Sequence, residues 1–170
     1  PQVLELSEVH GKTIGIVGMG RVGTKIAEIA KAFDMKVLGI ARNTIDQLPD
    51  VLRSADYVVD SLPLTKETHH LFTLDHFKKM KKSAYFINVG RGKTVVEKDL
   101  IQALQDKIIA GAGIDVVEEE PLPPSSPLWD LENVIITPHT SGLTPYYMDR
   151  AIAIFCKNLK AYLDKKPMPN

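Results

Sequence analysis

Short apolar runs alternate with amphipathic segments along the whole chain. The apolar runs are rich in β-branched residues and are typical of buried strands, which we predict at residues 13–17, 36–40, 57–61, 84–89, 108–116 and 133–137. The segments between and after these runs predict helices at 21–33, 44–55, 74–80, 97–107 and 145–165. Apolar residues recur at helical spacing in the first and last of them, at Val22, Ile26, Ile29, Ala30, Phe33, Ile152, Phe155, Leu159 and Tyr162.

This alternation predicts the fold class. Strands that alternate with helices favour an α/β fold, because the helices cross over from one parallel strand to the next. Right-handed crossovers then give a doubly wound, mostly parallel sheet (the Rossmann architecture), with six or so strands and helices on both faces. At 170 residues the chain is the size of one domain, and we expect residues 1–170 to form it.

Composition narrows the possible partners. Lysine and arginine number 21 and aspartate and glutamate also number 21, so we expect neither nucleic-acid nor membrane-surface binding. Cys156 is the only cysteine, which excludes an internal disulfide and a cysteine-based zinc site, and we expect no metal. No apolar run approaches the roughly 18 residues of a membrane span, and no signal-peptide pattern opens the chain, so we expect a cytoplasmic protein.

A glycine-rich turn follows the first predicted strand. It reads Gly18, Met19, Gly20, Arg21, Val22 and Gly23. A lone GxGxxG is a weak signal, but here it lies directly between a strand and a helix, as a dinucleotide site requires. Gly18 allows the tight turn, Gly20 lets a pyrophosphate approach the backbone, and Gly23 lets helix and strand pack closely. The amides of Arg21 and Val22 would face the phosphate at the helix N-terminus.

Charged residues also follow several later strands, at the sheet edge where such folds bind ligands. Arg91 follows the fourth predicted strand, Asp115 and Glu120 lie at and beyond the fifth, and His139 follows the sixth. The arginine can hold a substrate carboxylate through two hydrogen bonds. The histidine can exchange a proton with a carbonyl oxygen, and a carboxylate beside it would raise its pKa and fix its tautomer. Each residue alone also has a purely structural explanation.

Several sequence motifs occur in a fixed order along the chain, and together they are more specific than any one of them. They are "GKTIGIVGMGRVG", "SLPLTKETHHL", "FINVGRG", "GAGIDVVEEEPLP" and "PLWDLENVIITPHTSG", and they extend over nearly the whole chain. The chain resembles the nucleotide-binding domain of the D-isomer-specific 2-hydroxyacid dehydrogenases, in particular the glyoxylate and hydroxypyruvate reductases. Formate dehydrogenases fit less well, because their pattern lacks a glutamate at position 120.

The resemblance implies a set of site residues. It implies that Arg91 binds the substrate, that His139 is the acid and base, and that Glu120 is its partner. It also implies that six residues line the cofactor site: Leu62, Pro63, Val89, Asp115, Ser141 and Gly142. Of these, Ser141 and Gly142 would lie near the nicotinamide. Val96 stands where the family often has aspartate, and we expect this difference to be a small local change. We expect the other histidines to be surface or packing residues.

The resemblance also implies a longer protein and a partner. Family members have a substrate-binding domain, built from sequence on both sides of this segment, that residues 1–170 do not include. We therefore expect this chain to bind cofactor with little or no turnover of a 2-keto or 2-hydroxy acid. We also expect a homodimer, because family members usually dimerise through this domain.

Other functions fit parts of the same pattern. Phosphite and phosphoglycerate dehydrogenases share the arginine, glutamate and histidine, so the substrate stays open. A binding module of a different class, an NAD(H)-sensing corepressor, also keeps these residues. A return segment that completes a substrate domain would favour the enzyme, and extensions that dock partners would favour the corepressor.

The end of the second predicted strand bears on the choice of cofactor. An acid here binds the adenosine ribose hydroxyls and repels a 2′-phosphate, but the chain has Ala41 and Arg42, followed by Asn43. Alanine removes the repulsion, Arg42 can pair with a phosphate, and Asn43 can add a hydrogen bond. The sequence therefore predicts NADP as the preferred cofactor, with NAD possible if the arginine is only solvated.

Overall fold

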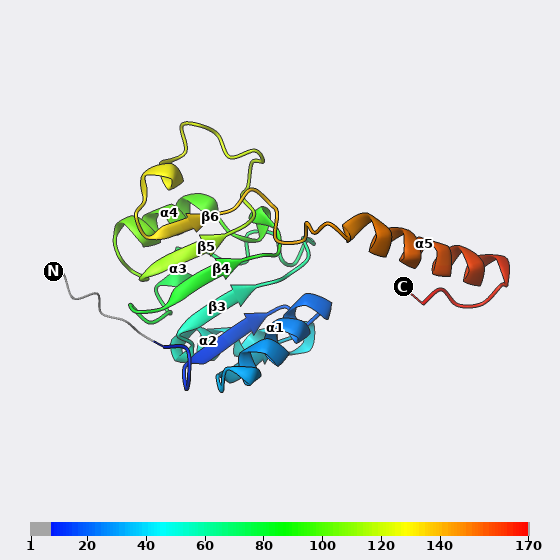
Figure 1. Ribbon diagram of the computed structural model, residues 1–170. Coiled ribbons are helices and arrows are strands. Elements are labelled where there is room, and N and C mark those ends of the chain that lie inside the picture. The colour runs from blue at the N-terminus through cyan, green and yellow to red at the C-terminus, as the bar shows by residue number, and fades with distance from the viewer. Residues whose placement is uncertain (1–7, 170) are drawn as a thin grey trace. The chain divides into compact units, whose positions relative to one another are not determined.

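The computed structural model describes residues 8–169, so the first seven residues and the last residue of the predicted domain lie outside it. The chain divides into two compact units, Pro1–Pro138 and His139–Asn170. We describe each unit by itself. The first unit holds the sheet and four α-helices, and the second holds one helix (Figure 1).

The first unit contains a six-stranded sheet in which every neighbouring pair is parallel. The strands are β1 (Thr13–Val17), β2 (Lys36–Ile40), β3 (Tyr57–Asp60), β4 (Tyr85–Asn88), β5 (Gly111–Ile114) and β6 (Val134–Ile136). Their order is β2-β1-β3-β4-β5-β6, so the winding reverses between β1 and β3. The predicted α/β class and doubly wound parallel sheet are therefore confirmed, although the last four strands are shorter than the sequence predicts.

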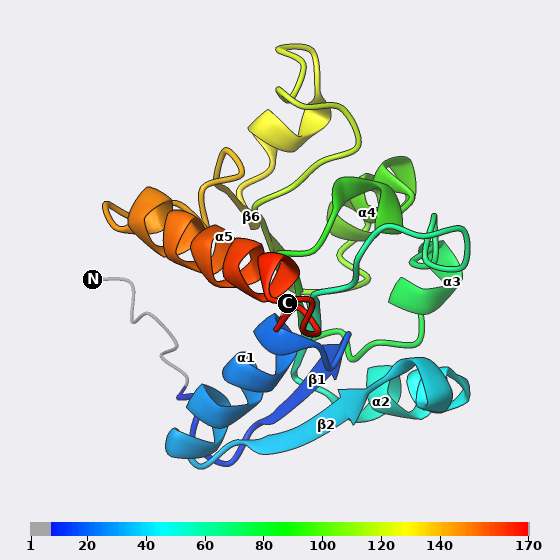
Figure 2. The ribbon, with the colours of Figure 1, turned by 90° about the vertical axis from the view of Figure 1, so that its right-hand side faces the viewer.

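Helices cover both faces of the sheet (Figure 2). One face carries α1 (Arg21–Ala32), and the other carries α2 (Leu48–Ser54), α3 (Leu74–Phe77) and α4 (Glu97–Gln105). The helix predicted at 44–55 is divided, because a 3-10 helix (Arg42–Gln47) precedes α2 and Pro49 lies in the first turn of α2. Shorter 3-10 helices lie at Gly92–Thr94 and Pro127–Asp130.

The larger core lies beneath α2, α3 and α4. Three fully buried phenylalanines anchor it: the ring of Phe86 on β4 meets the rings of Phe72 and Phe77 edge-on, at centroid distances of 5.0 and 5.2 Å. Edge-to-face packing of this kind adds to the burial of the rings themselves. This core fixes the central strands, whose carboxyl ends carry the loops described below.

Helix α1 packs on the sheet through its smallest residues. Gly23, Ala27 and Ala30 are buried. Val22, Ile29 and Phe33 are each more than half exposed. The helix therefore approaches the sheet through a narrow strip of small side chains, and most of the larger apolar residues that mark it in the sequence face outward.

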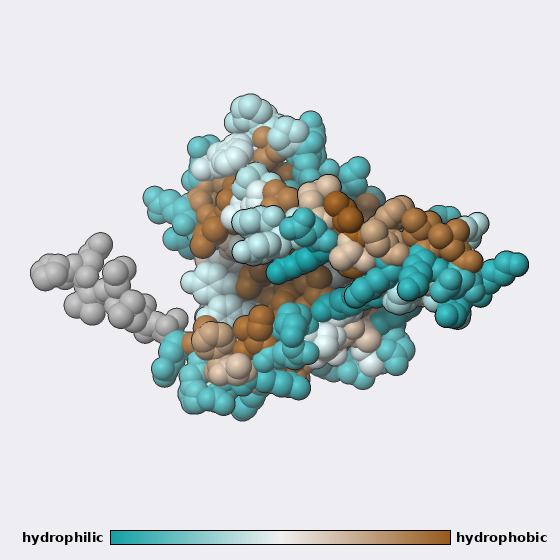
Figure 3. Space-filling model, turned by 45° about the vertical axis from the view of Figure 1, so that its right-hand side comes forward, coloured by the Kyte–Doolittle hydropathy of each residue, from teal (hydrophilic) through white to brown (hydrophobic). Residues whose placement is uncertain are grey.

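The second unit contains helix α5 (Tyr147–Leu163), which has no buried residue. Its larger apolar side chains remain exposed, and apolar surface is visible along the helix in Figure 3. The exposed residues include the four that the sequence places on one side: Ile152, Phe155, Leu159 and Tyr162. Among the residues that the structure describes, no helix has the length and apolarity to cross a membrane.

Candidate dinucleotide site

The glycine turn connects β1 to α1 and is packed at two of its three glycines. Gly18 has φ +106°, which favours glycine, and a Cβ there would lie 2.9 Å from the backbone of Ser61. A Cβ at Gly23 would lie 2.1 Å from the carbonyl oxygen of Gly18, so only glycine fits. A Cβ at Gly20 would meet no atom within 4 Å. The turn is thus fixed against the protein on one side and leaves its middle glycine open.

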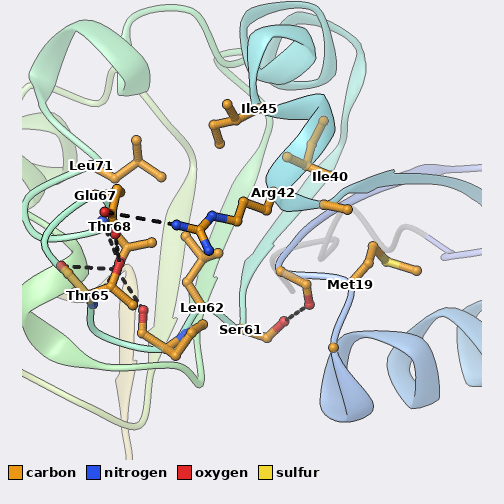
Figure 4. A pocket seen from close by; sticks show the side chains of 14 residues that line it. Met19, Ile40, Arg42, Ile45, Ser61, Leu62, Thr65, Glu67, Thr68 and Leu71 are labelled. Atoms are coloured by element: carbon orange, nitrogen blue, oxygen red, sulfur yellow. Dashed lines mark hydrogen bonds and ion pairs between the residues drawn. The ribbon is translucent and has the colours of Figure 1, made fainter.

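A cavity of about 510 Å³ lies where the turn meets the carboxyl ends of β1, β2 and β3. This is the point at which the strand order reverses, where doubly wound sheets bind their ligands. Six predicted cofactor residues line it (Figure 4): Gly18, Met19, Gly20, Arg42, Leu62 and Pro63. Four of the eight remaining lining residues are apolar, and together they offer a surface suited to the flat face of an adenine: Ile40, Ala41, Ile45 and Leu71.

Arg42 lies at the rim of this cavity, opposite Glu67. Its guanidinium nitrogen Nη2 lies 4.0 Å from Glu67 Oε1, and both side chains are largely exposed (Figure 4). The Thr65 hydroxyl donates to the other carboxylate oxygen of Glu67 at 2.8 Å. The hydrogen bonds from Thr65 and from the backbone of Glu67, together with the charge of Arg42, hold the pKa of Glu67 below its usual range. An acid therefore already faces the arginine that the sequence assigns to a phosphate.

The other predicted cofactor residues of the first unit do not line this cavity: Arg21, Val22, Gly23, Asn43, Val89 and Asp115. Asn43 is exposed beside Arg42, and Val89 is half-buried just after β4. Asp115 is buried after β5, where its Oδ1 accepts a hydrogen bond from the Thr137 hydroxyl at 2.5 Å. Ser141 and Gly142 belong to the second unit.

Arg91 lies on a loop that follows β4. Its side chain is exposed and donates to the carbonyl oxygen of Gly90 at 2.7 Å. Its own carbonyl oxygen accepts from the Asn88 side chain at 3.2 Å and contacts the Thr94 hydroxyl at 2.6 Å. A Cβ at Gly92 would lie 1.8 Å from the carbonyl of Val117, so this loop packs directly against the loop after β5. The backbone under Arg91 is thus well supported, whereas its guanidinium is accessible.

Glu120 lies on that neighbouring loop after β5. Its Oε1 accepts from the amide of Val117 at 3.4 Å. Two residues earlier, Glu118 and Glu97 each accept a hydrogen bond from the other's backbone amide at 2.9 Å. Val96 is the N-cap of α4 and has no side-chain cap, and the Glu118 carboxylate accepts a hydrogen bond from the first helical amide, that of Glu97. The N-terminus of α4 is therefore tied to the loop after β5.

His139 opens the second unit, and its backbone has an uncommon conformation, with φ 51°. Among residues 8–169, four other non-glycine residues share a positive φ. Asp34, Lys107 and Lys165 each lie two residues beyond a helix, where this conformation is ordinary. His70 lies in a turn, whereas His139 follows β6 without any helix end. Strained positions of this kind concentrate at functional sites.

Sequence reasoning missed two acids near these loops. Glu67 lines the cavity, and Asp60 is completely buried at the end of β3. An aspartate that ends an otherwise apolar strand, directly before a predicted cofactor segment, was a signal for the second. Glu67 had no comparable signal, because its arginine partner is distant in the sequence. The described residues contain no cluster of three side chains placed to hold a metal ion.

The fold and the site together define a class. A parallel, doubly wound sheet with a glycine turn and a cavity at its reversal point is a dinucleotide-binding domain. The particular family follows from a family model, "D-isomer specific 2-hydroxyacid dehydrogenase, NAD binding domain", which matches residues 1–141. The chain belongs to this family.

Known proteins agree with this assignment. Glyoxylate/hydroxypyruvate reductase B of Enterobacter sp. (strain 638) is 50% identical over 149 residues, which cover 81% of this chain and 46% of the relative. Glyoxylate reductase of Korarchaeum cryptofilum is 38% identical over 181 residues, covering all of this chain and 54% of the relative. The structure of an NADPH-dependent glyoxylate/hydroxypyruvate reductase of Sinorhizobium meliloti with NADP and sulfate has a TM-score of 0.88 at 30% identity, covering 98% and 57% of the two chains. The chain spans about half the length of the relatives it matches.

Proposed function

We propose that this chain is the cofactor-binding part of an oxidoreductase that transfers a hydride between NADP(H) and a small 2-keto or 2-hydroxy acid. The observation that carries the cofactor preference is Arg42 at the rim of the cavity, next to Ala41 where an acid would repel a 2′-phosphate. The names of the relatives support a substrate such as glyoxylate or hydroxypyruvate.

The residues of the cavity fit a dinucleotide. Gly20 leaves room for a pyrophosphate to approach the backbone, because a Cβ there would meet nothing within 4 Å. The apolar lining suits the adenine, and Arg42 provides a cation for the 2′-phosphate. Asn43, Val89, Asp115, Ser141 and Gly142 complete the proposed contacts along the rest of the cofactor.

Three residues carry the proposed chemistry. The bound cofactor supplies the hydride. Arg91 holds the substrate carboxylate through paired hydrogen bonds and orients the carbonyl group. His139 donates a proton to the carbonyl oxygen, or removes it in the reverse direction, and Glu120 fixes the tautomer of the imidazole. The accessible guanidinium of Arg91 and the strained backbone of His139 support these roles.

Calorimetry with NADPH and NADH, side by side, tests the cofactor assignment. We expect NADPH to bind more tightly by about 1–3 kcal/mol, as hydrogen bonds to charged groups usually contribute. Arg42→Ala should remove this preference, because it removes the cation that the phosphate meets. Arg53→Ala is the matched control, since Arg53 is exposed on α2 and pairs with Asp50 away from the cavity. Equal affinities, or an unchanged preference in Arg42→Ala, would show that Arg42 does not select the cofactor.

We also propose that the 170-residue chain forms a homodimer and has little turnover alone. The exposed apolar side chains on α1 and α5 support an interface between copies. Analytical sedimentation should show a species twice the 18.8 kDa mass of the chain. A monomer at micromolar concentration would contradict the dimer, and 2-keto acid turnover on the order of 1–1000 per second would contradict the low activity.

A further inference from the structure

Asp60 is an acid with no exposed surface at the carboxyl end of β3. One carboxyl oxygen, Oδ1, accepts from the amide of Leu62 at 2.9 Å. The other, Oδ2, lies 2.5 Å from the hydroxyl oxygen of Thr94, which is also fully buried. Burial, the largest cause, raises the pKa of Asp60 from 3.8 to about 6, against the opposing effect of the hydrogen bond from the Leu62 amide. The group joins a segment that lines the cofactor cavity to the loop that carries Arg91.

The Thr94 hydroxyl makes two short contacts with oxygen atoms. It lies 2.5 Å from Asp60 Oδ2 and 2.6 Å from the carbonyl oxygen of Arg91. Each contact is short enough to need a hydrogen between the oxygens. A hydroxyl has one proton and a carbonyl has none, so Thr94 can supply only one of the two. Asp60 Oδ2 is the group at these contacts that can carry a second proton.

We propose that Asp60 is protonated in the folded protein at mildly acidic pH and is then a positioning residue for Arg91. Asp60 Oδ2 donates to the Thr94 hydroxyl, and the hydroxyl donates to the carbonyl of Arg91, so a relay of two hydrogen bonds fixes the loop backbone. When Asp60 loses its proton, Thr94 can serve only one of the two oxygens, and the other contact becomes repulsive. The consequence for substrate binding rests on the proposed function of Arg91.

The surroundings of Asp60 favour the neutral acid. β1 and β4 flank it through Val17 and Asn88, which carry no charge. On the loop opposite, Arg91 and Lys93 are exposed. Among residues 8–169, Asp60 takes part in no ion pair. A fully buried carboxylate without a counter-ion is costly, and a hydrogen bond that the acid donates favours its neutral form further.

Carbon-13 NMR of the aspartate carboxyl groups in the 170-residue chain tests the proposal. We expect the Asp60 signal, identified by its loss in Asp60→Asn, to titrate well above the usual aspartate value of about 3.9. The amide signals of Arg91 and Gly92 should move with the same midpoint. Asp56 is the matched control: it lies just before the same strand and accepts from Lys81 Nζ at 2.8 Å, and its pKa is lowered.

Variants separate the relay from a general structural effect. Asp60→Asn can still donate to Thr94 and accept from Leu62, so the Arg91 and Gly92 amides should keep their low-pH positions and no longer titrate. Thr94→Val removes the relay and should displace these amides at every pH, whereas Thr94→Ser should restore them. An Asp60 carboxyl that titrates near 4 or below, or Arg91 amides that ignore its titration, would overturn the proposal. These signals are read without ligand, so failure of NADPH to bind would refute the proposed function and leave this result standing.

Discussion

Replacing Asp60 with asparagine should change how the stability of the protein depends on pH. The pKa of Asp60 rises from 3.8 to about 6 on folding, so unfolding releases a proton between these values. The stabilising contribution is complete below about pH 4 and is lost as the pH rises through about 6. A shift of about two pKa units corresponds to about 3 kcal/mol. The asparagine side chain of Asp60→Asn does not titrate, so this loss should be absent from the variant.

Urea unfolding followed by circular dichroism at pH 4 to 8 measures the effect. The free energy of unfolding of Asp60→Asn, relative to the parent, should rise by about 3 kcal/mol over this range. Asp56→Asn should show no such change over this range, because the stabilising contribution of Asp56 is already complete above about pH 4 and is lost only at lower pH. Burial raises the Asp56 pKa, but hydrogen bonds from Lys81 and Thr13 outweigh this and lower it, so Asp56 stabilises above pH 4. A difference between Asp60→Asn and the parent that stays constant with pH would refute the reasoning.

Four further substitutions test the cavity and the core. Gly23→Ala should lower the unfolding midpoint, because its Cβ would lie 2.1 Å from a carbonyl oxygen. Gly20→Ala should preserve stability and weaken NADPH binding. Equal stability of the two variants would contradict this packing. Phe86→Ala should cost about 3–5 kcal/mol in urea unfolding, and a loss below about 1 kcal/mol would show that the aromatic core is not essential. Glu67→Gln should strengthen NADPH binding in calorimetry and leave NADH binding unchanged. Glu28→Gln is a surface control. Weaker NADPH binding in Glu67→Gln would show that Glu67 does not compete with the phosphate.

The sequence predicted the fold well because its signals are local. Each predicted apolar run contains one strand, and the glycine turn lies between β1 and α1 as the motif requires. The buried face of α1 was harder to predict. The spacing of apolar residues favours a buried face with Val22, Ile29 and Phe33, which are exposed. The buried residues of the helix include Gly23 and Ala27 instead, because only small side chains allow the helix to approach the sheet closely.

The site was predictable only where a motif places residues in a fixed order. Gly18, Gly20 and Arg42 follow their strands in sequence, and the structure brings them to one cavity. The relay from Asp60 to Thr94 joins residues 34 positions apart, so its partners depend on the register of the sheet and on the path of a loop. No periodicity in the sequence encodes such a contact.

The ion pair between Arg42 and Glu67 also affects how salt acts on the cavity. Dissolved ions weaken the attraction of an exposed arginine for a phosphate, and they weaken its attraction for an exposed carboxylate as well. The carboxylate of Glu67 partly neutralises Arg42 before a 2′-phosphate binds. Rising ionic strength therefore weakens the competing pair between Arg42 and Glu67 as well as the attraction of Arg42 for the phosphate. We therefore expect the proposed NADPH affinity to vary less with ionic strength than it would with a lone arginine at the rim of the cavity.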